Sequence, residues 1–199
     1  MQNFFRTILM MYVTLAPTVI AGVINSVFCK LPVMKSLSRP LDGGRCLRDG
    51  KRIFGDNKTW KGIAGYFILN VLFSVIWGLI CSAGSMESLN YFYLGHENTI
   101  PLNILIGFLL GAGYSLFELP NSFIKRRLDI TPGKTINGPA RVFFIFLDQA
   151  DSVFGCALVI WIFYDLGILL YLGFVLVGAL THILINMLLY FLKLRKNMF

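Results

Sequence analysis

The segment VFFIFLDQADSVFGCALVIWIFY, residues 142–164, decides the fold of this chain. Nearly all of its residues are apolar, and it is long enough to cross a hydrocarbon layer of about 30 Å, which requires roughly 20 residues of helix. Yet its first half carries two carboxylates, Asp148 and Asp151. The segment therefore predicts a membrane-spanning helix that must accommodate two acidic side chains.

Four further stretches have a similar length and apolar character, at residues 8–29, 62–83, 101–120 and 167–192. With 56% hydrophobic and 14% charged residues, the 199-residue chain is too apolar for a soluble core of ordinary size. We expect an all-α, polytopic integral membrane protein with five transmembrane helices, forming a single membrane domain over residues 1–199. A cleaved signal peptide is the alternative for the first stretch, but that stretch exceeds the usual apolar region of about 7 to 15 residues and lacks an Ala-x-Ala-like site.

The basic residues predict how the chain is oriented in the membrane. Of the eighteen Lys and Arg residues, nine lie in the segment 30–61, five lie in the segment 121–141, and three follow the last span, whereas residues 84–100 contain none. Because Lys and Arg accumulate in cytoplasmic loops, we expect loops 30–61 and 121–141 and the C-terminus to be cytoplasmic. The N-terminus is then outside, and the protein is expected in the cell membrane.

Three acidic residues, Glu118, Asp148 and Asp151, lie within the predicted spans. An acidic side chain near the centre of a membrane helix costs roughly 2.5 to 3.5 kcal/mol, so each of them requires a compensating partner. Asp148 and Asp151 are three residues apart, which places them on one helix face with a rise of about 4.5 Å, so both can converge on one cation. Counted from Arg141, they lie roughly 10 to 15 Å along the helix. A divalent metal ion or a basic side chain is the expected partner.

Glu118 begins a second polar pattern, since Ser122 and Lys125 share its face if the helix continues past Pro120. The simplest alternative for Glu118 is a structural ion pair with Lys125 or with another cation. Mg²⁺ is usually held by one or two carboxylates together with substrate phosphates. Carboxylates facing basic, glycine-containing loops are therefore typical of phosphoryl or nucleotidyl transfer.

Two stretches of the sequence carry a resemblance to a known family. PLDGGRCLRDGKRIFGDNKTWKG, residues 40–62, resembles the first cytoplasmic loop of the CDP-archaeol synthase family. The combination of NSFIKRR (121–127), Pro-Gly (132–133) and LDQADSVFG (147–155) resembles the second polar region of that family, and it is similar to the closing signature of CDP-diacylglycerol synthases. Lys134-Thr135 after Pro-Gly, and Gln149 after the first Asp, favour the archaeol-synthase branch.

This resemblance implies a membrane cytidylyltransferase that uses CTP as co-substrate and Mg²⁺ as cofactor to convert a lipid phosphomonoester into a CDP-lipid and pyrophosphate. It implies that Asp148 and Asp151 are metal ligands, that Lys125 and Arg126 contact phosphates, and that Ser122 is a polar site residue. Glu118 stands where the family more often has Asp. The implied nucleotide-side loop consists of Gly55, Asp56, Asn57, Lys58 and Thr59.

Several alternatives stay open at this stage. A non-catalytic assembly protein could use the basic loops to bind anionic lipid, and a cation-coupled transporter could use the intramembrane acids, although the five unequal spans show no repeat. The lipid could be an ether isoprenoid or an ester acyl phosphate, and the site could hold one metal or two. CTP, the lipid phosphate and the bilayer are the expected partners, and no nucleic acid is expected. The GFLLG spacing at 107–111 suits either internal helix packing or a homodimer.

Overall fold

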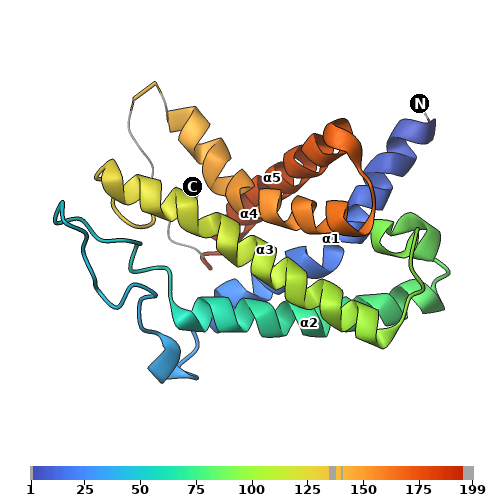
Figure 1. Cartoon of the computed structure of the whole chain (residues 1–199), viewed down its shortest axis with the longest axis horizontal. Coiled ribbons are helices and arrows are strands. Elements are labelled where there is room, and N and C mark those ends of the chain that lie inside the picture. Colours follow the sequence, from blue (N-terminus) through green and yellow to red (C-terminus); the bar gives the residue numbers. More distant parts are fainter. Residues whose placement is uncertain (1, 135–137, 140, 195–199) are drawn as a thin grey trace.

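The computed structural model describes residues 2–134, 138–139 and 141–194, and within these residues the protein is built from helices (Figure 1). The five long helices are α1 (Gln2–Phe28), α2 (Trp60–Ala83), α3 (Ile100–Arg127), α4 (Arg141–Phe163) and α5 (Gly167–Phe191). Three short 3-10 helices, η1 (Lys35–Leu37), η2 (Glu87–Leu89) and η3 (Tyr91–Tyr93), lie in the connections. All five long helices are long and apolar enough to cross a membrane, which confirms the five predicted spans.

The third helix is longer than predicted. The prediction that a loop starts at residue 121 is wrong, because α3 continues through Pro120 to Arg127. Its 28 residues correspond to about 42 Å, which exceeds the thickness of the hydrocarbon layer, so its last turns extend beyond the apolar region. The three basic residues of the last turn also interact favourably with the negative end of the helix dipole.

Parts of the predicted basic segments lie outside the described residues. These parts are residues 135–137 and 140 of the second loop, among them Thr135, and the tail residues Arg195 and Lys196.

The basic segments gather at one end of the molecule. In Figure 1, the segment between α1 and α2, the C-terminal end of α3 and the N-terminal end of α4 lie at the left. Lys30 Nζ donates to the main-chain carbonyl of Leu194, so the end of α5 returns to this side as well. The arrangement agrees with five alternating crossings, and the cytoplasmic location of this end stays a prediction from the charges.

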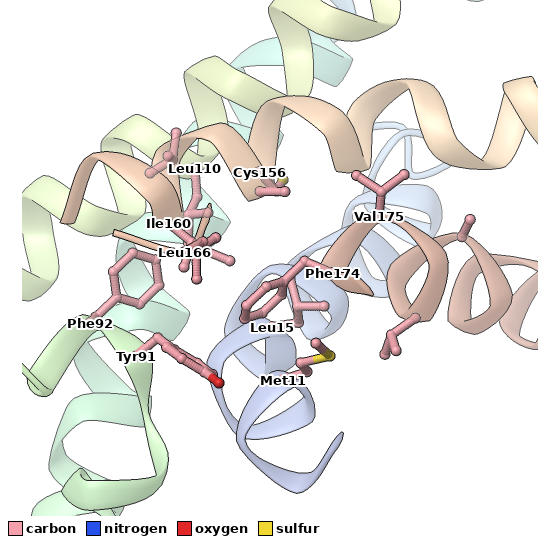
Figure 2. Packing of buried hydrophobic residues seen from close by; sticks show 14 of the residues in the cluster. Met11, Leu15, Tyr91, Phe92, Leu110, Cys156, Ile160, Leu166, Phe174 and Val175 are labelled. Atoms are coloured by element: carbon pink, nitrogen blue, oxygen red, sulfur yellow. The ribbon is translucent and has the colours of Figure 1, made fainter. Parts of the chain in front are cut away.

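The hydrophobic core lies toward the opposite end, where α1, α3, α4, α5 and η3 meet (Figure 2). The Tyr91 ring contacts the rings of Tyr164 and Phe174 edge-on, with centroid distances of 5.2 and 5.3 Å. Phe92 and Ile160 are almost completely buried in the same cluster. The buried charged side chains lie outside this cluster, toward the basic end, and they are Asp42, Lys61, Lys125, Arg126 and Asp151.

Glycines set the distance between α3 and its two neighbouring helices. A Cβ atom on Gly155 of α4 would overlap the carbonyl oxygen of Gly113 of α3, so the two backbones touch at this crossing. A Cβ atom on Gly107 would lie 2.5 Å from the Cα atom of Val71 of α2. The small-residue spacing in α3 therefore serves internal packing against α2, which was one of the two alternatives that the sequence left open.

We expect Gly155→Ala to destabilise the protein by about 1–3 kcal/mol, because the added methyl group forces α3 and α4 apart at a backbone contact. Gly95→Ala is the matched control, since a Cβ atom there would meet nothing within 4 Å. Thermal unfolding of the two purified variants in the same detergent measures the difference. Equal unfolding temperatures would contradict the close crossing.

Candidate functional site

The two intramembrane aspartates of α4 converge on one side chain of α3. Asn121 Nδ2 donates to Asp148 Oδ1 and to Asp151 Oδ2, at 2.8 Å in each case. Lys125 Nζ lies 2.9 and 2.7 Å from the two oxygens of Asp148. The backbone N–H of Ser152 donates to the other oxygen of Asp151 at 2.6 Å. The spacing of three residues thus brings both carboxylates to one place, as predicted. Asn121 donates a hydrogen bond to each of them, and Lys125 compensates the charge of Asp148.

These carboxylates face a cavity of about 270 Å³ at the basic end of the bundle. Side chains of α1, α3, α4, α5 and both basic segments contribute to its wall. Seven charged side chains line it: Lys58, Glu118, Lys125, Arg126, Lys134, Asp148 and Asp151. With four cations and three carboxylates, the wall is suited to an anionic ligand accompanied by a metal ion.

Glu118 pairs with the first basic segment. Its Oε1 lies 2.8 Å from Lys58 Nζ, so the acid has a cationic partner, although that partner is not Lys125. One turn further along α3, Ser122 Oγ accepts the backbone N–H of Gly55 at 3.2 Å. The face formed by Glu118, Ser122 and Lys125 therefore exists as predicted, and two of its three side chains fasten the loop to α3.

The buried carboxylate of Asp42 holds the first basic segment together. The Asp42 side chain is fully buried, and it accepts bonds from Arg52 Nε at 3.0 Å and Arg52 Nη2 at 2.6 Å. The backbone N–H groups of Gly44 and Phe54 donate to it as well. Burial alone would raise the pKa of Asp42, but the hydrogen bonds from Arg52 and from the two N–H groups outweigh it and lower the pKa to about 2. Asp42 therefore stays ionised.

The loop is also tied to the C-terminal end of α3. Arg127 pairs with Asp49 at 2.9 Å and donates to the carbonyl oxygen of Arg52. Lys51 pairs with Asp129 at 2.6 Å and donates to the carbonyl oxygen of Arg127. Because these contacts join the two basic segments, the position of residues 55–59 depends on the extended end of α3.

The five predicted nucleotide-side residues are not all at the cavity. Asn57 and Lys58 line it. Thr59 lines a neighbouring cavity of about 280 Å³, and its hydroxyl oxygen accepts the N–H of Gly62 as the N-cap of α2. Gly55 is bound to Ser122, and Asp56 is exposed and pairs with Arg52 at 2.7 Å. Gly55 and Asp56 thus stabilise the loop and do not line the cavity.

Two buried polar atoms at the cavity have no partner among the described residues. Arg126 is only 9% exposed and its Nε has no hydrogen bond, and the same holds for Oδ1 of Asn121, whose residue is 7% exposed. Buried polar groups are rarely left unsatisfied. A donor and an acceptor of this kind at one cavity are available to a ligand bound there.

The sequence interpretation missed Asn121 and Asp42. Asn121 could have been found as a buried amide four residues before Lys125 on a membrane helix, where polar side chains need partners. Asp42 lies among nine cations and resembles an ordinary loop acid. His182 and Asn186 line the cavity too, and Asn186 donates to Gln149 Oε1 at 2.5 Å, which joins α5 to α4 at the cavity.

The carboxylates at the cavity fit Mg²⁺ only when a bound ligand supplies further oxygen atoms to the metal. Within the described parts of the chain, no group of three or more His, Cys, Asp or Glu side chains is arranged to hold a metal ion. The two carboxylates Asp148 and Asp151 supply hard oxygen ligands of the number that Mg²⁺ takes from protein when substrate phosphates complete its coordination. The residues present therefore fit a metal–phosphate complex better than a metal ion alone.

The fold and the cavity define a five-helix membrane protein with a charged intramembrane site suited to a phosphate-bearing ligand. The chain belongs to the CDP-archaeol synthase family, because the family model described as CarS-like, CDP-archaeol synthase, matches residues 4–199.

Curated relatives and a solved structure agree with this assignment. A CDP-archaeol synthase of Thermofilum pendens is 32% identical over 180 residues, which cover 90% of this chain and 75% of that relative. A CDP-archaeol synthase of Pyrococcus furiosus is 36% identical over 102 residues, and this match spans about half of each chain, 51% and 53%. A solved intramembrane enzyme for archaeal membrane lipid biosynthesis matches with a TM-score of 0.60 and 25% identity, covering 88% of this chain and 92% of that one.

We expect Asp42→Asn to loosen the first basic segment, because it removes the buried charge that binds Arg52. Trypsin cleavage at the exposed residues Arg45 and Arg48 should become faster. Since the pKa of Asp42 is lowered, its stabilising effect is complete above the ordinary pKa of 3.8 and is lost only as the pH falls toward about 2. The protease resistance of the unsubstituted protein should therefore not change between about pH 6 and 9.

Asp49→Asn is the matched control in the same loop. The Asp49 side chain is 43% exposed, and exposed ion pairs contribute only about 0–1 kcal/mol. Equal cleavage rates for the two variants would show that Asp42 does not organise the loop.

Proposed function

We propose that this protein is a CTP-dependent cytidylyltransferase that converts a membrane lipid phosphomonoester into a CDP-activated lipid in phospholipid biosynthesis. The observation that carries the proposal is the pair of intramembrane carboxylates, Asp148 and Asp151, held together by Asn121 and Lys125 in a cavity with four cations. Membership of the CDP-archaeol synthase family supports it. The names of the relatives favour an archaetidic-type ether lipid phosphate over phosphatidate as the substrate.

In the proposed reaction, an oxygen of the lipid phosphate attacks the α-phosphorus of CTP, and the bond between that phosphorus and the bridging oxygen of the leaving pyrophosphate breaks. No covalent enzyme intermediate is required, so the protein acts by positioning the reactants and stabilising charge. Asp148 and Asp151 would hold Mg²⁺, and the bound ion would neutralise phosphate charge.

The cations of the cavity take the remaining roles in this proposal. Arg126 has a buried Nε without a hydrogen-bond partner in the described parts of the chain, and it is suited to bind a phosphate oxygen. Lys125 is within reach of both oxygens of Asp148, so it can compensate the carboxylate and bind a phosphate placed beside it. Lys58, held by Glu118 at 2.8 Å, presents a third positive charge from the loop side. Together these groups would keep two polyanions close to each other, which is the main electrostatic difficulty of the reaction.

Purified protein should transfer label from CTP into lipid in a Mg²⁺-dependent manner when it is offered an ether lipid phosphate and phosphatidic acid in parallel. Asp148→Asn and Asp151→Asn should each lower the rate by about 100-fold or more, because each removes a charged metal ligand. Asp165→Asn, at the turn before α5 on the opposite end of the bundle, is the control and should retain activity.

Failure of folded, Mg²⁺-binding protein to label either lipid would contradict the proposal and favour an assembly or transport role. Labelling of phosphatidic acid alone would keep the reaction and correct the substrate.

Asn121→Ala should weaken Mg²⁺-dependent CTP binding by about 10- to 100-fold. The reason is that Asp148 and Asp151 lose the donor that fixes the distance between their carboxylates. Asn186→Ala is the matched control, since Asn186 lines the same cavity but contacts Gln149. Calorimetric titration of CTP at several Mg²⁺ concentrations measures both. Equal CTP affinities for the two variants would show that Asn121 does not contribute to the binding site.

A further inference from the structure

An apolar groove of about 340 Å³ lies between α1, α2 and α5. Seven residues line it: Tyr12, Val13, Ala16, Val19, Ile20, Trp77 and Thr181. The only aliphatic hydroxyl among them, that of Thr181, donates to the carbonyl oxygen of Val177 in its own helix at 2.7 Å. The groove thus offers an apolar surface rather than a polar binding site.

A proline in α1 explains how Trp77 comes to lie in this groove. Pro17 has no N–H, so the carbonyl oxygen of Val13, four residues earlier, loses its partner in the helix. Trp77 Nε1 donates to that oxygen at 2.8 Å. The hydrogen bond satisfies the carbonyl and fixes the indole ring at the groove, which matters because an unsatisfied polar group in an apolar environment is costly.

The groove adjoins the charged cavity. Val19 of α1 lines both. Along α1, Tyr12, Ala16, Val19 and Val23 follow one another at spacings of three and four residues, which places them on one helix face. The first three line the groove and Val23 lines the cavity.

The facing helix shows the same transition. On α5, Thr181 lines the groove, whereas His182, Ile185 and Leu189, up to two turns further on, line the cavity. The seam between α1 and α5 is therefore apolar at one end, and at the other end it opens toward Asp148 and Lys125.

We propose that this groove holds a hydrocarbon chain of the lipid phosphate whose headgroup reacts in the charged cavity, an inference that rests on the proposed function. An amphiphilic substrate needs a charged pocket for its phosphate and an adjoining apolar path for its chain. The seam between α1 and α5 provides both, side by side, with Val19 in the wall of each. Tyr12 is 44% exposed at the groove, so a chain can enter from the bilayer without passing through the polar end.

Trp77 makes this proposal measurable without enzyme activity. Trp60→Phe and Trp161→Phe together leave Trp77 as the single tryptophan. We expect a chain-brominated ether lipid phosphate to quench its fluorescence saturably in nanodiscs, and the unbrominated phosphate to reverse the quenching. A chain-brominated neutral lipid at the same mole fraction should quench much less. Equal quenching by both lipids would show that the groove takes bulk lipid only, and this would overturn the proposal.

A groove-filling variant provides a second, kinetic test. Ala16→Phe should raise the KM for a long-chain lipid phosphate by about tenfold or more relative to a short-chain analogue, because the ring occupies the path of the long chain. Calorimetric affinity for CTP with Mg²⁺ should be unchanged. Ile24→Phe, an exposed position of α1 that lines none of the cavities described above, is the control and should leave the ratio of the two KM values unchanged.

The outcomes separate the two proposals. Selective quenching of Trp77 without any incorporation of CTP would retain the groove as a lipid phosphate site and reject the cytidylyltransferase. Incorporation without selective quenching, or with an unchanged KM ratio in Ala16→Phe, would retain the enzyme and reject the groove. Loss of CTP binding in Ala16→Phe would mean that the groove is not separate from the nucleotide site, and it would also reject the assignment.

Discussion

The cost of placing two carboxylates inside a membrane helix is the constraint on which the rest of this structure depends. Asp148 and Asp151 lie about 10 to 15 Å from the start of α4, where an uncompensated acid would cost several kcal/mol. Asn121 donates to both, and Lys125 neutralises one of them. Both partners come from α3, so α3 must continue past Pro120 and must lie close to α4.

The other features follow from this pairing of α3 and α4. The contact between Gly113 and Gly155 lets the two backbones touch one turn beyond Asp151. The extended end of α3 then serves as a support for the first basic segment, which Glu118, Ser122 and Arg127 bind at successive turns. Apolar packing at the far end of the bundle leaves the polar end free for a charged cavity. One interaction thus connects helix length, helix crossing and loop position.

Sequence patterns were sufficient for the parts of the molecule that local periodicity decides. Hydropathy predicts the five helices, and the three-residue spacing predicts that Asp148 and Asp151 share a face. The spacing of Glu118, Ser122 and Lys125 predicts the polar face of α3. The length of α3 was underestimated because Pro120 is an expected helix boundary, whereas a membrane helix can retain a proline when its neighbours satisfy the backbone.

The partners of individual charges could not be predicted in the same way. Whether Glu118 meets Lys58 or Lys125 depends on how the loop folds back. The loop in turn depends on the ion pair between the buried Asp42 and Arg52, a contact between residues ten positions apart. Asn121 was missed since an amide carries no charge that would mark it in an apolar segment. Its importance results from two carboxylates of another helix, which only the tertiary structure places beside it.

The central claim is that Asp148 and Asp151 bind a divalent ion together with the phosphates of CTP. The most direct test is phosphorus electron–nuclear double resonance on purified protein with CTP and Mn²⁺, which takes the same oxygen ligands as Mg²⁺. The account predicts a coupling between bound Mn²⁺ and the CTP phosphates that disappears in the double variant Asp148→Asn, Asp151→Asn. An undiminished coupling in that variant, or tight CTP binding by the unsubstituted protein without any bound Mn²⁺, would contradict it.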